Sequence, residues 1–319
     1  MLLPSRRVLE AIERTCRSHH TNKVLLGTPW PLLLLGPNLR RRGLRYSVIA
    51  HGAELIAPGA TPGVSRRVSA ALAGADLILP VSHHTAEKVG ALLIKHGRSL
   101  PRIEVLRPRV DLTRFHPGVS TAALRKRLNI RDGTPVILSF GRLVPRKGND
   151  RLLAAMREVR ERIPSAVLVI AGIGPEERKL RHLARADHGV IFTGRVRDVE
   201  APALYATADV FALPVADRWF GLEMEGLGVV LLEAAAAGTP CVTGRSGGTP
   251  EAVLDAVTGF VIDAREGAQL VEKITWLLEN PTHADQMGIW GRVHVEREFS
   301  GASLPLPLLE WLSGIASRS

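Results

Sequence analysis

Two carboxylates, Glu225 and Glu233, frame the segment of this 319-residue sequence that is best suited to chemistry. Between them lie glycines and then an apolar stretch typical of a helix start. Glycines let backbone amides at a helix amino terminus approach a phosphate, and the helix dipole favours negative charge there. On a helix, eight positions are about two turns, so both carboxylates would project to one side. This pattern favours a site for a phosphate and sugar hydroxyls, although spacing alone equally fits two unrelated acids.

Two cations, Arg142 and Lys147, lie between an expected strand and an expected helix. Arg binds phosphate in a bidentate manner and Lys as a point charge, so the pair could hold a nucleoside diphosphate. Taken alone, they would more often be ordinary surface cations. Residues 171–175 and 246–251 are also glycine-rich turns, each at the end of an expected strand. Three such loops at strand ends favour a nucleotide site.

The elements that would position these residues alternate between short apolar runs and helical patterns, which is typical of parallel α/β proteins. The expected strands are residues 23–26, 46–51, 77–81, 103–106, 136–140, 166–171, 190–193, 210–214, 241–244 and 260–262. Helices are expected at 6–20, 121–128 and 150–162. Open α/β sheets bind ligands at the carboxyl ends of their strands, where these loops fall.

A turn-rich segment ending at Gly118 predicts the main domain boundary. We expect one domain at residues 1–117 and a second at 118–290. Residues 291–319 would form a helical segment that Pro305 and Pro307 interrupt and that packs back on the first domain.

The formal charge of +11 points to an anionic partner. A membrane surface, a phosphorylated substrate and a merely solvated arginine-rich face all fit. Nucleic acid fits least, because two Tyr and seven Phe offer little stacking surface. The only tight basic cluster is Arg40, Arg41 and Arg42.

Cysteines and histidines indicate neither disulfides nor a metal. There are only two cysteines, Cys16 and Cys241, and the 11 histidines lack ligand spacing, so we expect a reduced cytoplasmic compartment and no metal. The densest apolar run, 32–35, is far too short to span a bilayer, and no signal peptide is predicted.

Together these motifs resemble glycosyltransferase family four, which has the GT-B fold of two Rossmann-like parallel-sheet domains facing a cleft. Glu225 and Glu233 match its E-x7-E motif, and Gly141, Arg142 and Lys147 match its G-R-x5-K motif. The string from 214 to 228 looks especially like the GDP-mannose-dependent phosphatidylinositol monomannoside mannosyltransferases. The resemblance implies a retaining mannosyltransferase that uses GDP-mannose, needs no metal or other cofactor, and acts on a lipid-linked acceptor. It would be peripheral on the inner face of the cell membrane, where Arg40–Arg42 suit anionic lipid.

The resemblance also implies roles for the donor-site residues. Arg142 and Lys147 would bind the pyrophosphate and steady the leaving group, while Glu225 would contact the sugar hydroxyls. The amides near the sugar and phosphate would be those of Gly226, Leu227 and Gly228. Glu233 would hold the ribose.

Further roles concern the base and the reacting sugar. The backbone near Arg195 and Val196 would meet the base. A His-Gly-x-Glu segment, 51–54, would put His51 near the reacting sugar, although a lone strand-end histidine is more often structural.

Two departures from the family pattern stand out. Arg109 replaces a glycine in a Pro-x-Gly-Val-Asp turn and would be strained if that turn needs a positive φ. The usual first strand and Gly-Gly loop are absent, which predicts a late-assigned start or a truncated amino-terminal domain. Besides an active mannosyltransferase, the alternatives are therefore a same-family enzyme with another sugar nucleotide or a soluble acceptor, and an inactive nucleotide-binding remnant.

Overall fold

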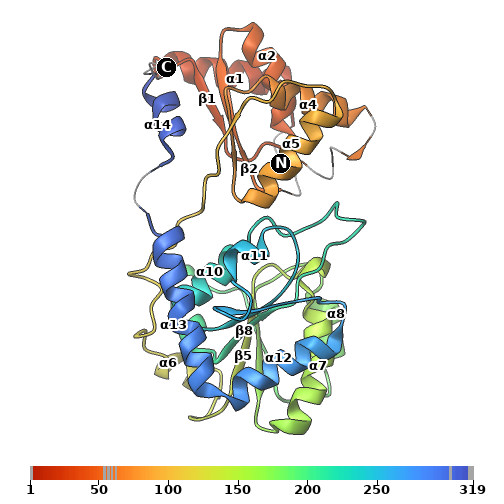
Figure 1. The fold of residues 1–319 in the computed structure, drawn as a ribbon, viewed down its shortest axis with the longest axis vertical. Helices are drawn as coiled ribbons and strands as arrows, with labels where there is room; N and C mark the ends of the chain where they lie inside the picture. The colour runs from red at the N-terminus through yellow and green to blue at the C-terminus, as the bar shows by residue number, and fades with distance from the viewer. Residues whose placement is uncertain are drawn as a thin grey trace. The chain divides into compact units, whose positions relative to one another are not determined.

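The chain divides into two compact units. The computed structural model describes residues 3–52, 55, 58, 60, 61, 63–301 and 304–314. Unit 1 comprises Met1–Arg107, Trp219–Leu227 and Ala302–Ser319, and unit 2 comprises Pro108–Arg218 and Gly228–Gly301 (Figure 1). The boundary predicted at residue 117 lies beyond Arg107, and the segment predicted as 291–319 is shared between the units. Two short pieces of chain far along the sequence therefore belong to unit 1.

Unit 1 is built on a four-stranded parallel sheet in the order β1-β2-β3-β4. Its elements are α1 (Arg6–Ser18), β1 (Lys23–Leu26), η1 (Leu32–Leu35), α2 (Gly36–Arg41), β2 (Arg45–Ala50), α4 (Val64–Ala73), β3 (Leu77–Pro80), α5 (His83–Lys95), β4 (Arg102–Ile103) and α14 (Leu306–Ser313). Alternate residues of β3 point to opposite faces. Ile78 packs in the core with α1, α2, α4 and α5, whereas Leu77 and Leu79 pack against Leu308 and Trp311 of α14.

Strand β4 is shorter than the predicted 103–106. The amides of Glu104 and Leu106 still donate to the carbonyls of Ile78 and Pro80, at 3.0 and 2.8 Å. Pro80 has no amide hydrogen to return a bond, so the ladder beyond Ile103 is one-sided.

Unit 2 is built on a six-stranded parallel sheet in the order β10-β9-β8-β5-β6-β7. Its strands are β5 (Val136–Phe140), β6 (Val167–Ala171), β7 (Val190–Gly194), β8 (Val210–Leu213), β9 (Cys241–Gly244) and β10 (Gly259–Ile262). Its helices are α6 (Ala122–Arg127), η2 (Pro145–Lys147), α7 (Asn149–Arg162), α8 (Glu177–Leu183), η3 (Asp198–Glu200), α9 (Ala201–Thr207), α10 (Val229–Ala236), α11 (Thr249–Ala252), α12 (Gly267–Glu279) and α13 (Pro281–Glu298).

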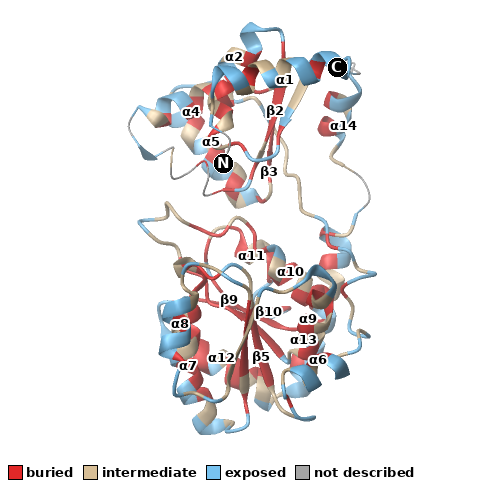
Figure 2. Cartoon of the chain, turned by 180° about the vertical axis from the view of Figure 1, so that it is seen from behind, coloured by how far each residue is buried: buried red, intermediate tan, exposed pale blue. Residues whose placement is uncertain are grey.

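Helices cover both faces of the larger sheet, and buried side chains fill the space between the layers (Figure 2). On one face, Leu152, Met156 and Val159 of α7 pack with α8, α12 and the strands, as their helical spacing predicts. Helices α9, α10 and α13 cover the other face. The expected α/β class with parallel sheets is confirmed.

The predicted carboxy-terminal segment, 291–319, begins inside a helix and contains a second one. Helix α13 runs from Pro281 to Glu298, so residue 291 lies within it. Pro307 does not interrupt a helix but lies in the first turn of α14, with Pro305 as its N-cap. Proline is tolerated there because a first-turn amide has no partner within the helix.

Candidate active site

The strand order of unit 2 reverses between β5 and β8. Strands β5, β6 and β7 run outward in one direction from this point, and β8, β9 and β10 in the other. At such a switch point the loops after the two central strands diverge and leave a crevice, which is where open α/β sheets bind ligands. Arg142 and Lys147 follow β5 directly, so the sheet topology puts both cations at this crevice.

The loops after β5 and β8 are held together by their backbones. Gly148 has a φ of 71°, and a β-carbon there would lie 2.2 Å from the carbonyl oxygen of Pro214. Arg151 donates to the same oxygen at 2.9 Å, and the Ala216 amide donates to the Arg146 carbonyl at 3.0 Å. Glycine is therefore required at 148, and the cations before it stand on a rigid turn.

The other glycine turns adjoin this pair of loops. A β-carbon on Gly172 would lie 2.1 Å from the Gly141 carbonyl oxygen. The Gly172 amide donates to Gly194 at the end of β7, at 2.9 Å. Ser246 donates to a carboxylate oxygen of Asp217 at 2.5 Å, which joins the loops after β9 and β8. The three turns singled out in the sequence, which follow β5, β6 and β9, are thus joined through their neighbouring loops. Together they form the edge of the crevice, which we call the rim.

The predicted cations on this rim differ in exposure. Arg142 is exposed, whereas Lys147, at the end of η2, is only 6% exposed. Arg195 and Val196 follow β7 on the same rim, Arg195 exposed and Val196 half-buried. The arrangement offers an exposed guanidinium and a buried ammonium to an anion.

The two glutamates of the E-x7-E motif do not share a helix. Helix α10 begins only at Val229, and its N-cap Gly228 is left-handed, with a φ of 88°. Glu225 precedes the helix in a loop that belongs to unit 1, while Glu233 lies on α10 in unit 2. The expectation that both project from one helical face is wrong, because Gly228 turns the chain between them.

Glu233 is held by a residue that the sequence did not single out. The Tyr205 hydroxyl donates to Glu233 Oε2 at 2.6 Å. Burial raises the pKa of Glu233, and the Tyr205 hydrogen bond opposes that rise. Rings of Phe115, Phe140 and Phe211 surround Tyr205. The packing fixes the tyrosine, and the tyrosine fixes the carboxylate.

In unit 1, the segment bearing Glu225 packs against the carboxyl ends of the strands. A β-carbon on Gly226 would lie 2.1 Å from the carbonyl oxygen of His51. Ser82, the N-cap of α5, donates through its hydroxyl to the Gly226 carbonyl at 2.9 Å. Glu225 is 8% exposed and Leu227 is also buried. The structure therefore brings His51 and Gly226 together. Sequence reasoning missed Ser82, and the signal that could have found it is a serine directly before a predicted helix.

His51 itself is oriented by the residue that follows β1. Its Nε2 lies 2.8 Å from the carbonyl oxygen of Gly27. A carbonyl only accepts, so Nε2 carries a proton, and in the neutral ring Nδ1 is the acceptor nitrogen. Ala53 and Glu54 of the His-Gly-x-Glu segment lie outside the described residues.

Arg109 is not strained. The described non-glycine residues with a positive φ are His20, Asn129, Trp219, Phe220 and Ala256. Arginine therefore fits its position without a left-handed backbone.

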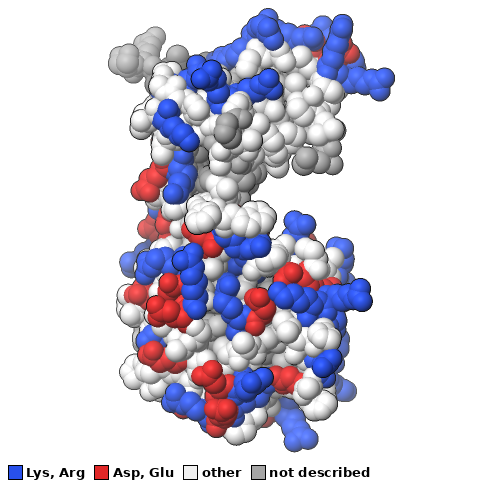
Figure 3. All heavy atoms as spheres, turned by 90° about the vertical axis from the view of Figure 1, so that its right-hand side faces the viewer, with Lys and Arg blue, Asp and Glu red and all other residues white. Residues whose placement is uncertain are grey.

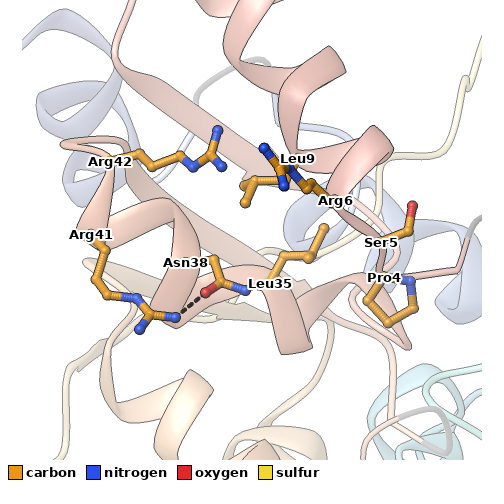
Figure 4. A pocket seen from close by; sticks show the side chains of 8 residues that line it. All are labelled: Pro4, Ser5, Arg6, Leu9, Leu35, Asn38, Arg41 and Arg42. Carbon is orange, nitrogen blue, oxygen red and sulfur yellow. Dashed lines mark hydrogen bonds between the residues drawn. The ribbon is translucent and has the colours of Figure 1, made fainter.

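The surface of unit 1 carries a basic pocket. Its volume is about 400 Å³, and its lining residues are Pro4, Ser5, Arg6, Leu9, Leu35, Asn38, Arg41 and Arg42 (Figure 4). Arg41 is held by Asn38, and Arg42 by Glu13. None of the lining residues is acidic. On the face in Figure 3, Lys and Arg predominate over unit 1, whereas unit 2 carries both signs.

No helix in the described part of the chain is long and apolar enough to cross a membrane. Within the same residues, no cluster of three or more His, Cys, Asp or Glu side chains could hold a metal ion.

Two parallel-sheet α/β units with strand-end loops of this kind define a GT-B glycosyltransferase fold, and solved structures agree. HepE of Anabaena, solved with UDP and glucose, is 20% identical over 95% of this chain and 81% of its own, with a TM-score of 0.77. Sucrose-phosphate synthase of Thermosynechococcus elongatus is 22% identical over 96% of this chain and 77% of its own, with a TM-score of 0.80.

The chain belongs to the family "Glycosyl transferases group 1", whose model matches residues 120–294, and it is a glycosyltransferase. It is 38% identical, over 98% of its length and 82% of the relative, to the GDP-mannose-dependent alpha-(1-6)-phosphatidylinositol monomannoside mannosyltransferase of Mycolicibacterium smegmatis. The GDP-mannose-dependent monoacylated alpha-(1-6)-phosphatidylinositol monomannoside mannosyltransferase of Corynebacterium glutamicum is 36% identical over 94% of this chain and 78% of the relative. The predicted family resemblance is confirmed.

Proposed function

We propose that this chain transfers mannose from GDP-mannose to a phosphatidylinositol mannoside-type lipid, with retention of the anomeric configuration. The observation that carries the proposal is the near full-length likeness to mannosyltransferases of that specificity. The rim at the β5/β8 switch point supports it, because a nucleotide sugar needs cations and amides at such a crevice.

In this proposal cations and backbone amides hold the donor. Arg142 and Lys147 bind the diphosphate and stabilise the charge that develops on the departing GDP. The amides of Gly226, Leu227 and Gly228 meet the sugar and its phosphate. Positioned cations and amides of this kind act electrostatically, so no metal is required.

The remaining roles concern the sugar, the ribose and the base. Glu225 accepts hydrogen bonds from the sugar hydroxyls, and Glu233, fixed by Tyr205, accepts those of the ribose. The backbone at Arg195 and Val196 meets the base. His51, oriented through Nε2, faces the reacting sugar.

We also propose that unit 1 docks on an anionic membrane surface. The basic pocket with Arg6, Arg41 and Arg42 supports this, since each cation near such a surface contributes about 1 kcal/mol. Charge reversal of Arg41 and Arg42 together should weaken sedimentation with phosphatidylserine vesicles. Unchanged sedimentation would rule the pocket out.

The test of the activity is transfer of labelled mannose from GDP-mannose to a phosphatidylinositol mannoside, with a chelator present. Glu225→Ala should abolish turnover, whereas Glu272→Ala, at an exposed glutamate of α12, should not. An unchanged rate in Glu225→Ala contradicts the site assignment. Tighter binding of UDP than of GDP would favour another donor, and GDP binding without transfer would favour a nucleotide-binding remnant.

A further inference from the structure

An apolar groove on unit 1 remains outside the roles assigned so far. Its volume is about 280 Å³, close to the lower end of the ~300–1,000 Å³ range of ligand pockets. Its lining residues are Leu55, Ala60, Lys88, Val89, Ala91, Leu92, Lys95 and Leu222. Every one is apolar except the two lysines. The groove thus suits a ligand that is mostly hydrocarbon.

The lysines give the groove a charge. Lys88, Leu92 and Lys95 recur on one side of α5, because residues four and three apart are neighbours on a helix. Both lysines are exposed, and among the described residues neither has an acidic partner. A lysine ammonium is a compact point charge that binds phosphate. The complementary ligand is therefore an apolar chain joined to a phosphate.

The groove adjoins the segment that carries Glu225. Leu222, in one wall, belongs to the same unit 1 segment, Trp219–Leu227. At the start of α5, Ser82 donates to Gly226, and His84 Nε2 lies 3.1 Å from the sulfur of Met224. Helix α5 has 13 residues, a length of about 20 Å. Its first turn touches the Glu225 segment, and its later turns line the groove.

We propose that this groove binds the acyl chain of an anionic glycerophospholipid next to its phosphate, with Lys88 and Lys95 at the phosphodiester. In the transfer reaction, the groove would bind the acyl chain of the lipid acceptor. This role in transfer rests on the proposed function, whereas lipid binding itself does not. The groove is distinct from the basic pocket of Figure 4, whose lining comes from α1 and α2 and their flanking residues.

The binding test titrates the full chain with palmitoyl lysophosphatidylinositol below its micelle concentration. The comparison ligands are glycerophosphoinositol, which lacks the chain, and an uncharged detergent, which lacks the phosphate. We expect the lysolipid to bind at least about tenfold more tightly than either, since burying even a few methylenes accounts for that factor. Equal binding of glycerophosphoinositol would overturn the acyl site, and equal binding of the detergent would overturn the role of the lysines.

Two variants locate the site. Ala91→Trp fills the groove from an exposed position, and the pair Lys88→Glu, Lys95→Glu reverses its charge. Each should weaken lysolipid binding about tenfold. The matched controls, Ala123→Trp and Lys126→Glu on exposed positions of α6 in unit 2, should leave it unchanged. If reversal of Arg41 and Arg42 removes lysolipid binding while the groove variants keep it, the basic pocket is the site and the proposal is wrong.

Transfer assays separate this proposal from the activity. Ala91→Trp should raise the KM for an acylated acceptor about tenfold and leave transfer to its deacylated form unchanged. Equal KM values for the two acceptors in the unaltered chain would overturn the groove proposal and leave the mannosyltransferase standing. If the chain transfers no mannose but binds the lysolipid through the groove, the proposed activity is wrong and the proposed lipid site is supported.

Discussion

The carbonyl oxygen of His51 lies so close to Gly226 that a β-carbon at 226 would be only 2.1 Å away. The contact joins the end of β2 to the segment that carries Glu225, within unit 1. The Ser82 hydroxyl also holds this glycine, by donating a hydrogen bond to the Gly226 carbonyl. A glycine at 226 thus sets the position of the neighbouring carboxylate.

Substituting Gly226 by Ala should impair catalysis more than folding. The added methyl group meets backbone, which cannot turn aside as a side chain would, so the Glu225 segment must shift. A displacement of about 1 Å at a reacting centre lowers turnover about 100-fold. Steady-state kinetics would measure this, with thermal unfolding as the folding check.

Gly267→Ala is the matched control for this change. A β-carbon on Gly267 meets nothing within 4 Å, and this glycine begins α12, far along the chain from the site residues. Its turnover should equal that of the unaltered chain. Wild-type turnover in Gly226→Ala would show that the His51 contact does not position Glu225.

Replacing Tyr205 by Phe should shift the pH dependence of GDP binding. Burial raises the pKa of Glu233, so the carboxylate protonates, and the ribose contact weakens, at a higher pH than for an ordinary glutamate. The Tyr205 hydrogen bond lowers that pKa, so its removal raises the pKa further. We expect GDP affinity to fall earlier as the pH is lowered, as calorimetry at several pH values would measure.

Tyr46→Phe provides the control for the loss of a tyrosine hydroxyl. Tyr46 is the only other tyrosine in the chain and lies in the core of unit 1, where it donates to Ala71. Its substitution should reduce stability without moving the pH profile. A profile that is the same in Tyr205→Phe and the unaltered chain would mean that Glu233 does not contact the nucleotide.

Much of this architecture is predictable from local pattern. Apolar runs of four to six residues between turn residues predict the strands, and the spacing of Leu152, Met156 and Val159 predicts the buried face of α7. These features depend on neighbours in sequence. The one-sided end of β4 could not be foreseen, because it depends on Pro80 of the adjacent strand.

The candidate site was predictable in its residue types but not in its geometry. Glycines after β5, β6 and β9 indicated adjoining loops, which the structure contains. Spacing alone could not reveal that Gly228 is left-handed and that the E-x7-E motif is divided between two units. Nor could it reveal Tyr205, whose bond to Glu233 spans 28 residues of chain.

Removing the cations after β5 should weaken nucleotide binding. A hydrogen bond to a charged group contributes about 1.5–3 kcal/mol, so Arg142→Ala should lower GDP affinity about 10- to 100-fold. Lys147→Ala should lower it similarly and also reduce stability, because its side chain is buried. Arg157→Ala, on the exposed side of α7, is the control and should bind GDP normally. Unchanged affinity in both test variants would contradict the diphosphate assignment.

Asp76 should stabilise unit 1 in a pH-dependent way. It accepts hydrogen bonds from Arg40, from Arg45 at 2.8 Å and from Trp311 of α14 at 2.9 Å. Burial would raise the pKa of Asp76, but these three bonds outweigh it and lower the pKa below 3.8. Its stabilising contribution is therefore complete above the ordinary aspartate pKa and is lost as the pH falls through the lower folded-state value.

Asp76→Asn should accordingly reduce the free energy of unfolding by about 1–3 kcal/mol at neutral pH, where the carboxylate is charged and its donors are left with a weaker acceptor. The difference from the unaltered chain should shrink as the pH falls from the ordinary aspartate pKa through the lower folded-state value, since Asp76 then becomes protonated and loses its charge. Urea unfolding followed at several pH values would measure it. Trp311→Phe removes one of the three donors and some packing, and the pH-dependent part of its effect should be smaller than that of Asp76→Asn because Arg40 and Arg45 still hold the aspartate. A difference that stays constant with pH would mean that the charge of Asp76 contributes nothing and that its shape alone supports α14.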